Sequence, residues 1–289
     1  MASFALEHLT FTYPGQTRPA LDDLTLTVPE GAVTVLCGES GSGKSTLLRQ
    51  LKTCLTPHGT VSGTVCLGGT RLKDIPFAEQ ARRIGFVLQH PDDQIVTDKV
   101  FHELAFGLES LGCEEKTMRL RVAEMASYFG IADWFERDVG ALSGGQKQML
   151  NLASVVVMRP DVLILDEPTA ALDPIAESAQ YKAYEELCFG KSSLYISHRL
   201  ASTMFCDRIA LMKDGRIAEW GTHEELMANS EIYREVYESQ TRGKAADVPA
   251  EEDIPAKNDV SAKNDVSAKN DVPAKDNVPA KNDKEGGAR

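Results

Sequence analysis

The segment of residues 38–46 constrains the possible fold of this chain most, because its glycines and its lysine have the spacing of a loop that binds nucleotide phosphates. It reads GESGSGKST, follows the apolar run of residues 33–37 and precedes the largely apolar residues 47–51. That is the order strand, glycine-rich turn, helix. Gly38, Gly41 and Gly43 allow a tight turn whose N–H groups point at one anion. We therefore predict a phosphate site here, next to the positive end of the following helix.

The side chains of this loop suit separate tasks. Lys44 is placed to reach the β- and γ-phosphates, and the Ser45 hydroxyl is placed to ligate Mg²⁺. The remaining predicted contacts of the loop are Glu39, Ser40, Ser42 and Thr46. The expected cofactors are a nucleotide and Mg²⁺.

Composition excludes several classes of protein. Acidic residues outnumber basic ones by 43 to 31 in 289 residues, and no cluster of Lys and Arg stands out, so a nucleic-acid surface is not expected. The six cysteines are scattered without C-x-x-C pairs, which favours reduced thiols in a cytosolic compartment. No apolar run approaches the roughly 18 residues of a membrane span, so any membrane role is expected to depend on a partner.

The order of elements predicts an α/β fold. Strands and helices alternate in a way typical of a parallel sheet, interrupted by a mainly helical block at about residues 90–158. The expected strands are 4–13, 24–28, 33–37, 61–67, 70–73, 84–88, 162–165 and 193–196, with a hairpin at 209–212 and 216–220. The expected helices are 44–55, 98–111, 116–129, 146–158 and 175–188, with two short ones before residue 240.

The chain from residue 241 onward differs in kind from the rest. From Val248 it repeats every six residues with one apolar residue per repeat, among alternating Lys and Asp. Such a segment buries too little to fold, and we expect a disordered tail at residues 241–289, with a stacked β-solenoid as the alternative.

Two further segments carry candidate chemistry. Ser143, Gly144, Gly145 and Gln146 stand directly before a predicted helix and form a second candidate anion site. The apolar strand 162–165 is followed by Asp166 and Glu167. Because adjacent side chains on a strand point to opposite faces, we expect different roles: Asp166 in the Mg²⁺ shell, and Glu167 as the general base for water.

Taken together, these motifs resemble the ATP-binding cassette (ABC) transporter ATPases over residues 3 to about 240. The resemblance implies a P-loop NTPase core of the RecA-like type, with an antiparallel β subdomain and a helical insertion. It implies an ATPase domain over residues 1–240, with ATP and Mg²⁺ as cofactors.

The resemblance also assigns residues that the spacing alone leaves open. Tyr13 matches the aromatic residue that stacks on adenine. Gln89 matches the glutamine that touches Mg²⁺ and water, Asp173 matches a loop that communicates across the dimer, and His198 matches the histidine at the γ-phosphate.

Members of this family work as head-to-tail dimers with membrane subunits. The resemblance implies that residues 143–146 of one cassette cover the ATP held by another, so we expect a homodimer or heterodimer, docked on an integral membrane subunit at the cytoplasmic face. The chain departs from the family at Met149, where Arg is usual.

The two halves of the chain favour different transporter classes. Residues 89–94, QHPDDQ, resemble the ATPases of energy-coupling-factor (ECF) importers of vitamins and metal ions, whereas residues 195–202 and 214–227 resemble exporters. We favour the importer, because membrane partners contact the first region. An exporter subunit is the alternative, and a non-transport ABC ATPase is less favoured because no coiled coil, zinc hook or second cassette is present.

Overall fold

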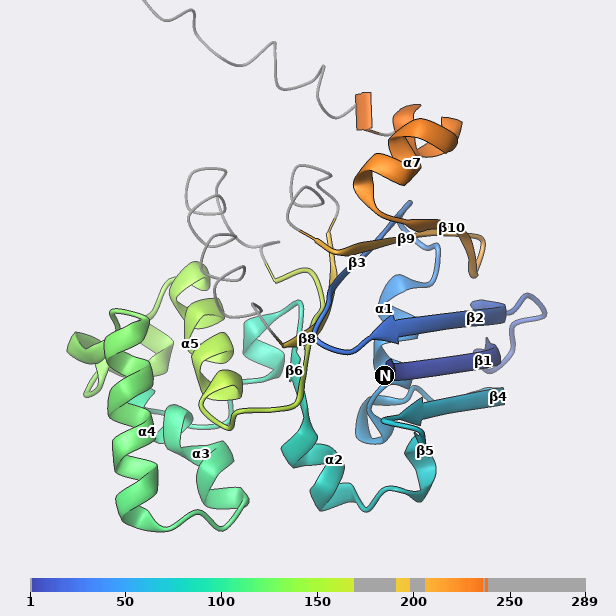
Figure 1. Ribbon diagram of the computed structural model, residues 1–289. Coiled ribbons are helices and arrows are strands. Elements are labelled where there is room, and N and C mark those ends of the chain that lie inside the picture. The colour runs from blue at the N-terminus through green and yellow to red at the C-terminus, as the bar shows by residue number, and fades with distance from the viewer. Residues whose placement is uncertain (1, 169–190, 198–205, 236, 239–289) are drawn as a thin grey trace, which may run out of the picture. The chain divides into compact units, whose positions relative to one another are not determined.

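The computed structural model describes residues 2–168, 191–197, 206–235, 237 and 238. The chain divides into two units, Met1–Asp247 and Val248–Arg289, and the second unit lies wholly outside the described residues. The expected helix at 175–188 and the repetitive tail also fall outside them. The description below therefore concerns the first unit (Figure 1).

A mainly parallel sheet forms the centre of this unit. In the described part its order is β10-β9-β3-β8-β7-β6, with β10 alone antiparallel to its neighbour. The strands are β3 (Val33–Gly38), β6 (Ile84–Val87), β7 (Val162–Leu165), β8 (Ser192–Ile196), β9 (Arg208–Lys213) and β10 (Arg216–Gly221). Successive residues are buried on opposite faces, Val35 in one core cluster and Leu36 in another, as a sheet covered on both sides requires.

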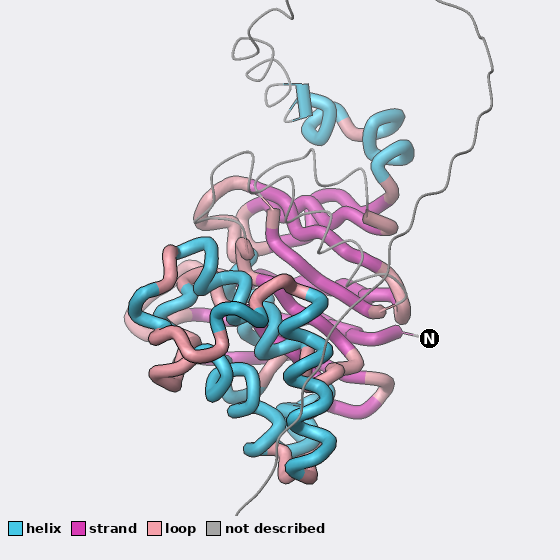
Figure 2. Tube along the Cα trace, turned by 90° about the vertical axis from the view of Figure 1, so that its left-hand side faces the viewer, coloured by secondary structure: helices cyan, strands magenta, loops and turns pink. Residues whose placement is uncertain are grey.

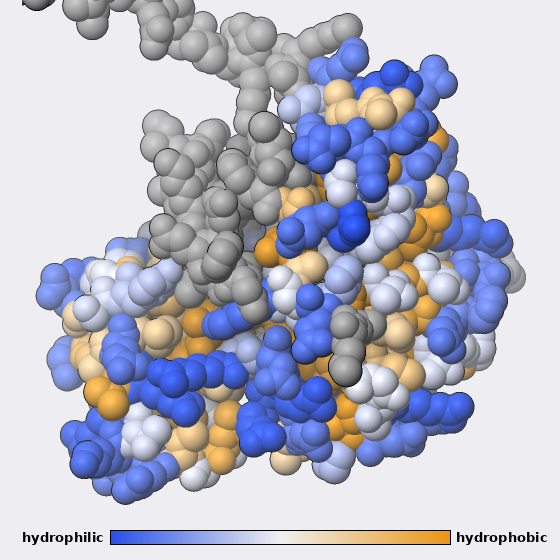
Figure 3. Space-filling view, viewed as in Figure 1, coloured by the Kyte–Doolittle hydropathy of each residue, from blue (hydrophilic) through white to orange (hydrophobic). Residues whose placement is uncertain are grey.

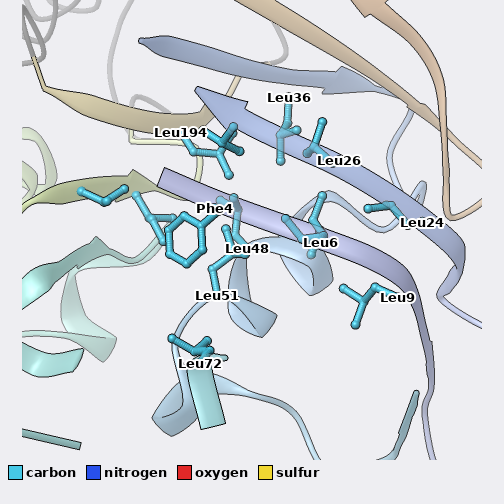
Figure 4. Packing of buried hydrophobic residues seen from close by; sticks show 14 of the residues in the cluster. Phe4, Leu6, Leu9, Leu24, Leu26, Leu36, Leu48, Leu51, Leu72 and Leu194 are labelled. Carbon is cyan, nitrogen blue, oxygen red and sulfur yellow. The ribbon is translucent and has the colours of Figure 1, made fainter. Parts of the chain in front are cut away.

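A smaller antiparallel sheet packs over one face of the first. Its order is β2-β1-β4-β5. The strands are β1 (Ala2–Thr12), β2 (Leu21–Pro29), β4 (Thr60–Leu67) and β5 (Thr70–Arg71). Figure 4 shows Phe4 and Leu6 from β1 packed with Leu36 from β3 and Leu48 from α1 (Lys44–Gln50). Each such fully buried side chain stabilises the fold by roughly 1.5–3 kcal/mol, so the helix that follows the phosphate loop is held firmly between the sheets.

The helical insertion has a core of its own. It contains α3 (Val100–Ser110), α4 (Glu115–Tyr128) and α5 (Gly144–Val156). Val100, Leu104 and Leu108 lie one turn apart on α3 and are completely buried in this cluster. From the side of the insertion, these helices stand in front of the strands (Figure 2). No helix of the described residues is both long and apolar enough to cross a membrane.

Three local expectations were wrong. The helix expected over 44–55 ends at Gln50, because Lys52 is extended and its Nζ donates to the Ile84 carbonyl at 2.8 Å. The strand expected over 70–73 ends at Arg71, and a 3₁₀ turn buries Leu72. The helix α2 (Phe77–Arg83) was missed, although Pro76 at its N-cap and Arg82 and Arg83 in its last turn were signals.

The other described elements lie within about three residues of their expected bounds. Beyond the hairpin come α7 (His223–Asn229) and helical residues 231–235, in agreement with the two short helices expected there. The hairpin is not separate from the core, since its first strand, β9, extends the parallel sheet beside β3.

Candidate functional site: a nucleotide cavity

The phosphate loop has the tight turn that its glycines predicted. Gly38 has φ 138° and Gly43 has φ 101°, a backbone conformation that L side chains rarely adopt. A Cβ at Gly38 would lie 2.2 Å from the Met212 carbonyl oxygen, and one at Gly43 would lie 2.5 Å from that of Ala20. Neighbouring backbone therefore leaves no space for a side chain at either position.

Lys44 closes the loop on itself. Its side chain is almost fully buried, and its Nζ donates to the carbonyl oxygens of Gly38 at 2.9 Å and Glu39 at 2.8 Å. Burial lowers the pKa of Lys44, whereas the nearby groups Glu167, Cys37 and Asp166 act to raise it. The loop thus holds a positive charge at its centre, with two of its three donors used by loop carbonyls.

Ser45 and Asp166 form the pair that the sequence suggested for Mg²⁺. The Ser45 Oγ donates to Asp166 Oδ1 at 2.9 Å, while Asp166 Oδ2 is buried and has no hydrogen-bond partner in the described structure. Burial raises the pKa of Asp166, partly opposed by the bond from Ser45 and by the charge of Arg49. A buried carboxylate oxygen without a donor, beside a hydroxyl, fits the oxygen ligands that Mg²⁺ takes.

Glu167 faces a different direction from Asp166, but not for the reason expected. Both residues lie beyond the end of β7 at Leu165, and Glu167 has φ 47°, a conformation uncommon outside glycine. The backbone turn at Glu167, rather than strand alternation, leaves Asp166 buried in the core and Glu167 at the cavity. There the Gln89 Nε2 donates to Glu167 Oε2 at 2.7 Å.

A cavity of about 540 Å³ brings Tyr13, Gln89 and Glu167 together with most of the phosphate loop. Its lining comprises Tyr13, Gln16, Arg18, Pro19, Ala20, Ser40, Gly41, Gly43, Lys44, Ser45, Thr46, Gln89, Glu167, Asp214 and Gly215. At one end the Tyr13 hydroxyl lies 3.0 Å from Thr46 Oγ1, and the edge of its ring meets Phe11 at a centroid distance of 4.8 Å. The other predicted loop residues, Gly38, Glu39 and Ser42, do not line the cavity.

Sequence reasoning missed one wall of the cavity. Gln16, Arg18, Asp214 and Gly215 line it, although none was a candidate. The signal that existed was the Asp-Gly pair, which correctly indicated a turn. Nothing in the sequence indicates that this turn packs against a loop almost two hundred residues earlier in the chain.

The segment of residues 143–146 lies away from this cavity. Ser143 is the N-cap of α5, accepting from the Gln146 N–H at 3.3 Å while the Gln146 side chain accepts from the Ser143 N–H at 2.9 Å. Ser143 and Gly144 are exposed, and none of the four residues, Gly145 and Gln146 included, lines the cavity. In Figure 1, α5 stands in the helical lobe, apart from α1, which follows the phosphate loop.

The same helix holds the loop that carries Gln89. Lys147 Nζ lies 2.6 Å from Asp92 Oδ1, and Asn151 Nδ2 donates to the Pro91 carbonyl at 3.2 Å. Met149, the departure from the family, packs against the core of the helical insertion. Asp173 and His198 lie outside the described residues.

Comparisons with known proteins agree with this fold. Residues 21–170 match the ABC transporter family. The energy-coupling factor transporter ATP-binding protein EcfA1 of Lacticaseibacillus paracasei is 36% identical over 226 residues, which cover 78% of this chain and 80% of that protein. The structure of cbiO1 from Clostridium perfringens, part of the ABC transporter complex cbiONQ, has a TM-score of 0.70 at 30% identity and covers 86% of this chain and 99% of that one.

Two further similarities are to longer proteins. A putative ABC transporter ATP-binding protein of Bacillus cereus is 40% identical over 234 residues, and this chain spans only 42% of its length. A bacterial Atm1-family ABC exporter with ATP bound has a TM-score of 0.72 at 26% identity, with 83% of this chain and 42% of that one covered. With the family matched over residues 21–170 and the EcfA1 relative matched over most of its length, the chain belongs to the ATP-binding proteins of the ABC transporter family.

Proposed function

We propose that this chain binds and hydrolyses ATP to energise an ABC transporter of the ECF type, which takes up a vitamin or a metal ion. The observation that carries the proposal is the single cavity that joins Tyr13, the phosphate loop, Gln89 and Glu167. An exporter subunit is the second candidate, supported by the similarity to the Atm1-family exporter.

The predicted site residues have separate proposed roles. Tyr13 would stack on the base, the N–H groups of the loop and Lys44 would hold the phosphates, and Ser45, Asp166 and Gln89 would hold Mg²⁺. Bound there, Mg²⁺ would supply positive charge to the phosphate oxygens. Glu167 accepts a proton from the attacking water, and Gln89, which donates to its carboxylate, orients it. His198 at the γ-phosphate and Asp173 at the dimer contact complete the proposal.

A second cassette is part of the proposed working unit. The exposed, capped start of α5 is a second candidate anion site, and the lysine nearest to it, Lys147, forms an ion pair with Asp92. None of residues 143–146 lines the cavity of its own chain. Residues 143–146 of one cassette would therefore cover ATP held by the other, in a homodimer or a heterodimer.

We propose that the membrane subunit docks on an apolar groove between the core and the helical insertion. The groove has a volume of about 460 Å³ and is walled by residues of α2 and α3, among them Phe77, which is 63% exposed, and Phe106, which is 42% exposed. Figure 3 shows apolar residues along the boundary between the helical lobe and the core. A helix of an integral membrane subunit, with an apolar face, would cover these rings and hold the chain at the cytoplasmic face of the membrane.

Co-purification from native membranes tests the proposal. The wild-type chain should recover a membrane subunit and hydrolyse ATP, and Phe77→Glu with Phe106→Glu should lose the partner while keeping basal hydrolysis. Leu120→Glu is the matched control, because Leu120 is 60% exposed on α4 and does not line the groove. Recovery of a multi-span exporter subunit would overturn the importer proposal, and equal recovery with the double variant would overturn the docking site.

A further inference from the structure

The turn between β9 and β10 joins the phosphate loop to the loop between β1 and β2. The Gly215 N–H donates to the Ser42 carbonyl at 3.1 Å, and the Asp22 N–H donates to the Gly215 carbonyl at 3.0 Å. A Cβ at Gly215 would lie 2.8 Å from the Ala20 carbonyl oxygen. Asp214 and Gly215 both have positive φ, 52° and 79°, as a two-residue hairpin turn of type I′ requires. Backbone contacts on both sides therefore fix the position of Asp214.

Two exposed ion pairs link this turn to the β1–β2 connection, and only one of them borders the cavity. Arg18 Nη2 lies 2.6 Å from Asp214 Oδ1, and both residues line the cavity. Arg216 Nη2 lies 2.7 Å from Asp22 Oδ2, and neither residue lines it. Because exposed pairs of this kind add little to stability, the Arg18 pair is dispensable for folding, and the Arg216 pair is its matched control.

The lining of the cavity combines two kinds of chemistry. Lys44, Gln89 and Glu167 are the groups proposed for the phosphates, Mg²⁺ and water, whereas Tyr13 and Arg18 carry planar groups that no phosphate contact requires. A guanidinium group offers five N–H donors and a flat face that stacks on rings, and here the bond to Asp214 uses one nitrogen. Arg18 thus lines the cavity with donors and a planar face that suit a base or a ribose.

We infer that Arg18 contacts the base or ribose of the bound nucleotide, with Asp214 as the positioning residue that holds its guanidinium. The inference rests on the nucleotide site proposed above and adds a second binding residue to the aromatic ring of Tyr13. Since ATP and ADP share the nucleoside, Arg18 serves both equally.

Titration of the full chain with ATP and with ADP, each with Mg²⁺, tests this inference. Arg18→Ala should weaken both nucleotides by the same factor, about fivefold to tenfold, without a change in the melting temperature of the free protein. Asp214→Asn, which keeps a residue that tolerates positive φ, should weaken both by a smaller factor and add nothing to Arg18→Ala. Inorganic tripolyphosphate, which has no nucleoside, should compete equally well against wild type and Arg18→Ala.

Arg216→Ala separates a binding role from a structural one. It removes an ion pair on the same turn and should leave both affinities within about twofold. Equal losses for Arg18→Ala and Arg216→Ala would overturn the inference, as would unchanged affinity with Arg18→Ala or a loss for ATP that ADP does not share. A wild-type chain that binds neither nucleotide would instead overturn the proposed function itself.

Discussion

At the scale of single residues, Glu167 is where the proposed chemistry is most directly testable. Glu167→Gln keeps the size of the side chain but removes its ability to accept a proton. Hydrolysis should fall by roughly 100-fold to 10,000-fold, while ATP affinity stays close to that of wild type. Phosphate release and a fluorescent-nucleotide titration measure the two quantities. Near wild-type turnover in the variant would show that Glu167 is not the base.

Asp166 should make the nucleotide-free protein sensitive to pH. Burial raises the pKa of Asp166 in the folded state, so the folded protein binds this proton more tightly than the unfolded chain does. Its contribution to stability is complete below the unfolded pKa of about 3.9 and is lost as the pH rises through the raised folded pKa. Asp166→Asn carries no charge and should melt about 2 °C or more above wild type at pH 8.

The pH profile of melting temperature decides this second prediction. The advantage of Asp166→Asn should shrink as the pH is lowered toward the unfolded pKa, and the variant should lose the response to Mg²⁺. Asp133→Asn is the control, because Asp133 is exposed and its removal should give no such trend. An advantage that does not change with pH would contradict the argument.

At the scale of elements, the start of α5 combines a structural role with a proposed binding role. Ser143→Ala removes the capping acceptor and should destabilise the protein by about 1 kcal/mol. Ser143→Asp retains a capping acceptor and suits the positive helix end, so the melting temperature should be kept. It also places a carboxylate where the phosphate of a partner cassette would lie. Hydrolysis should therefore fall by about 100-fold.

A second helix provides the control for this prediction. Thr222 caps α7 with the same reciprocal pair of bonds, to Glu225, far from any proposed nucleotide contact. Thr222→Ala should lower the melting temperature about as much as Ser143→Ala does, with hydrolysis per folded molecule unchanged. If Ser143→Asp hydrolyses ATP like wild type, residues 143–146 do not cover a nucleotide.

At the scale of the whole molecule, the repetitive C-terminal segment is expected to be energetically independent. One apolar residue in six cannot bury enough surface to couple this segment to the ATPase core. Deletion of residues 248–289 should leave the melting temperature within about 1 °C and hydrolysis unchanged. Calorimetry of the full chain and of the truncated protein measures this, and a clear fall in melting temperature on truncation would contradict the prediction. The boundary near residue 240 stays a prediction.

Much of the fold and of the site followed from local chemistry. Three local features predicted their own structure: the glycines of the phosphate loop, the Lys44-Ser45 pair and the carboxylates after β7. Each of them requires a particular backbone conformation or a nearby opposite charge. The strands of the parallel sheet were visible because their residues are apolar on both faces. By contrast, α2 was missed because its anchor, the buried Gln80, is polar and bonds to carbonyls of a turn that the sequence does not reveal.

The sequence by itself determined that this chain folds around a phosphate loop, and it predicted the proposed Mg²⁺ ligands and the proposed base for water after strands of one sheet. Those features depend on residue type and on short spacing along the chain, and both can be read from the sequence. Only the tertiary structure decided which distant segments meet: the turn of Asp214 against the loop of Arg18, and α5 against the loop of Gln89. The physical reason is that such contacts arise from packing between elements, and no local propensity encodes them.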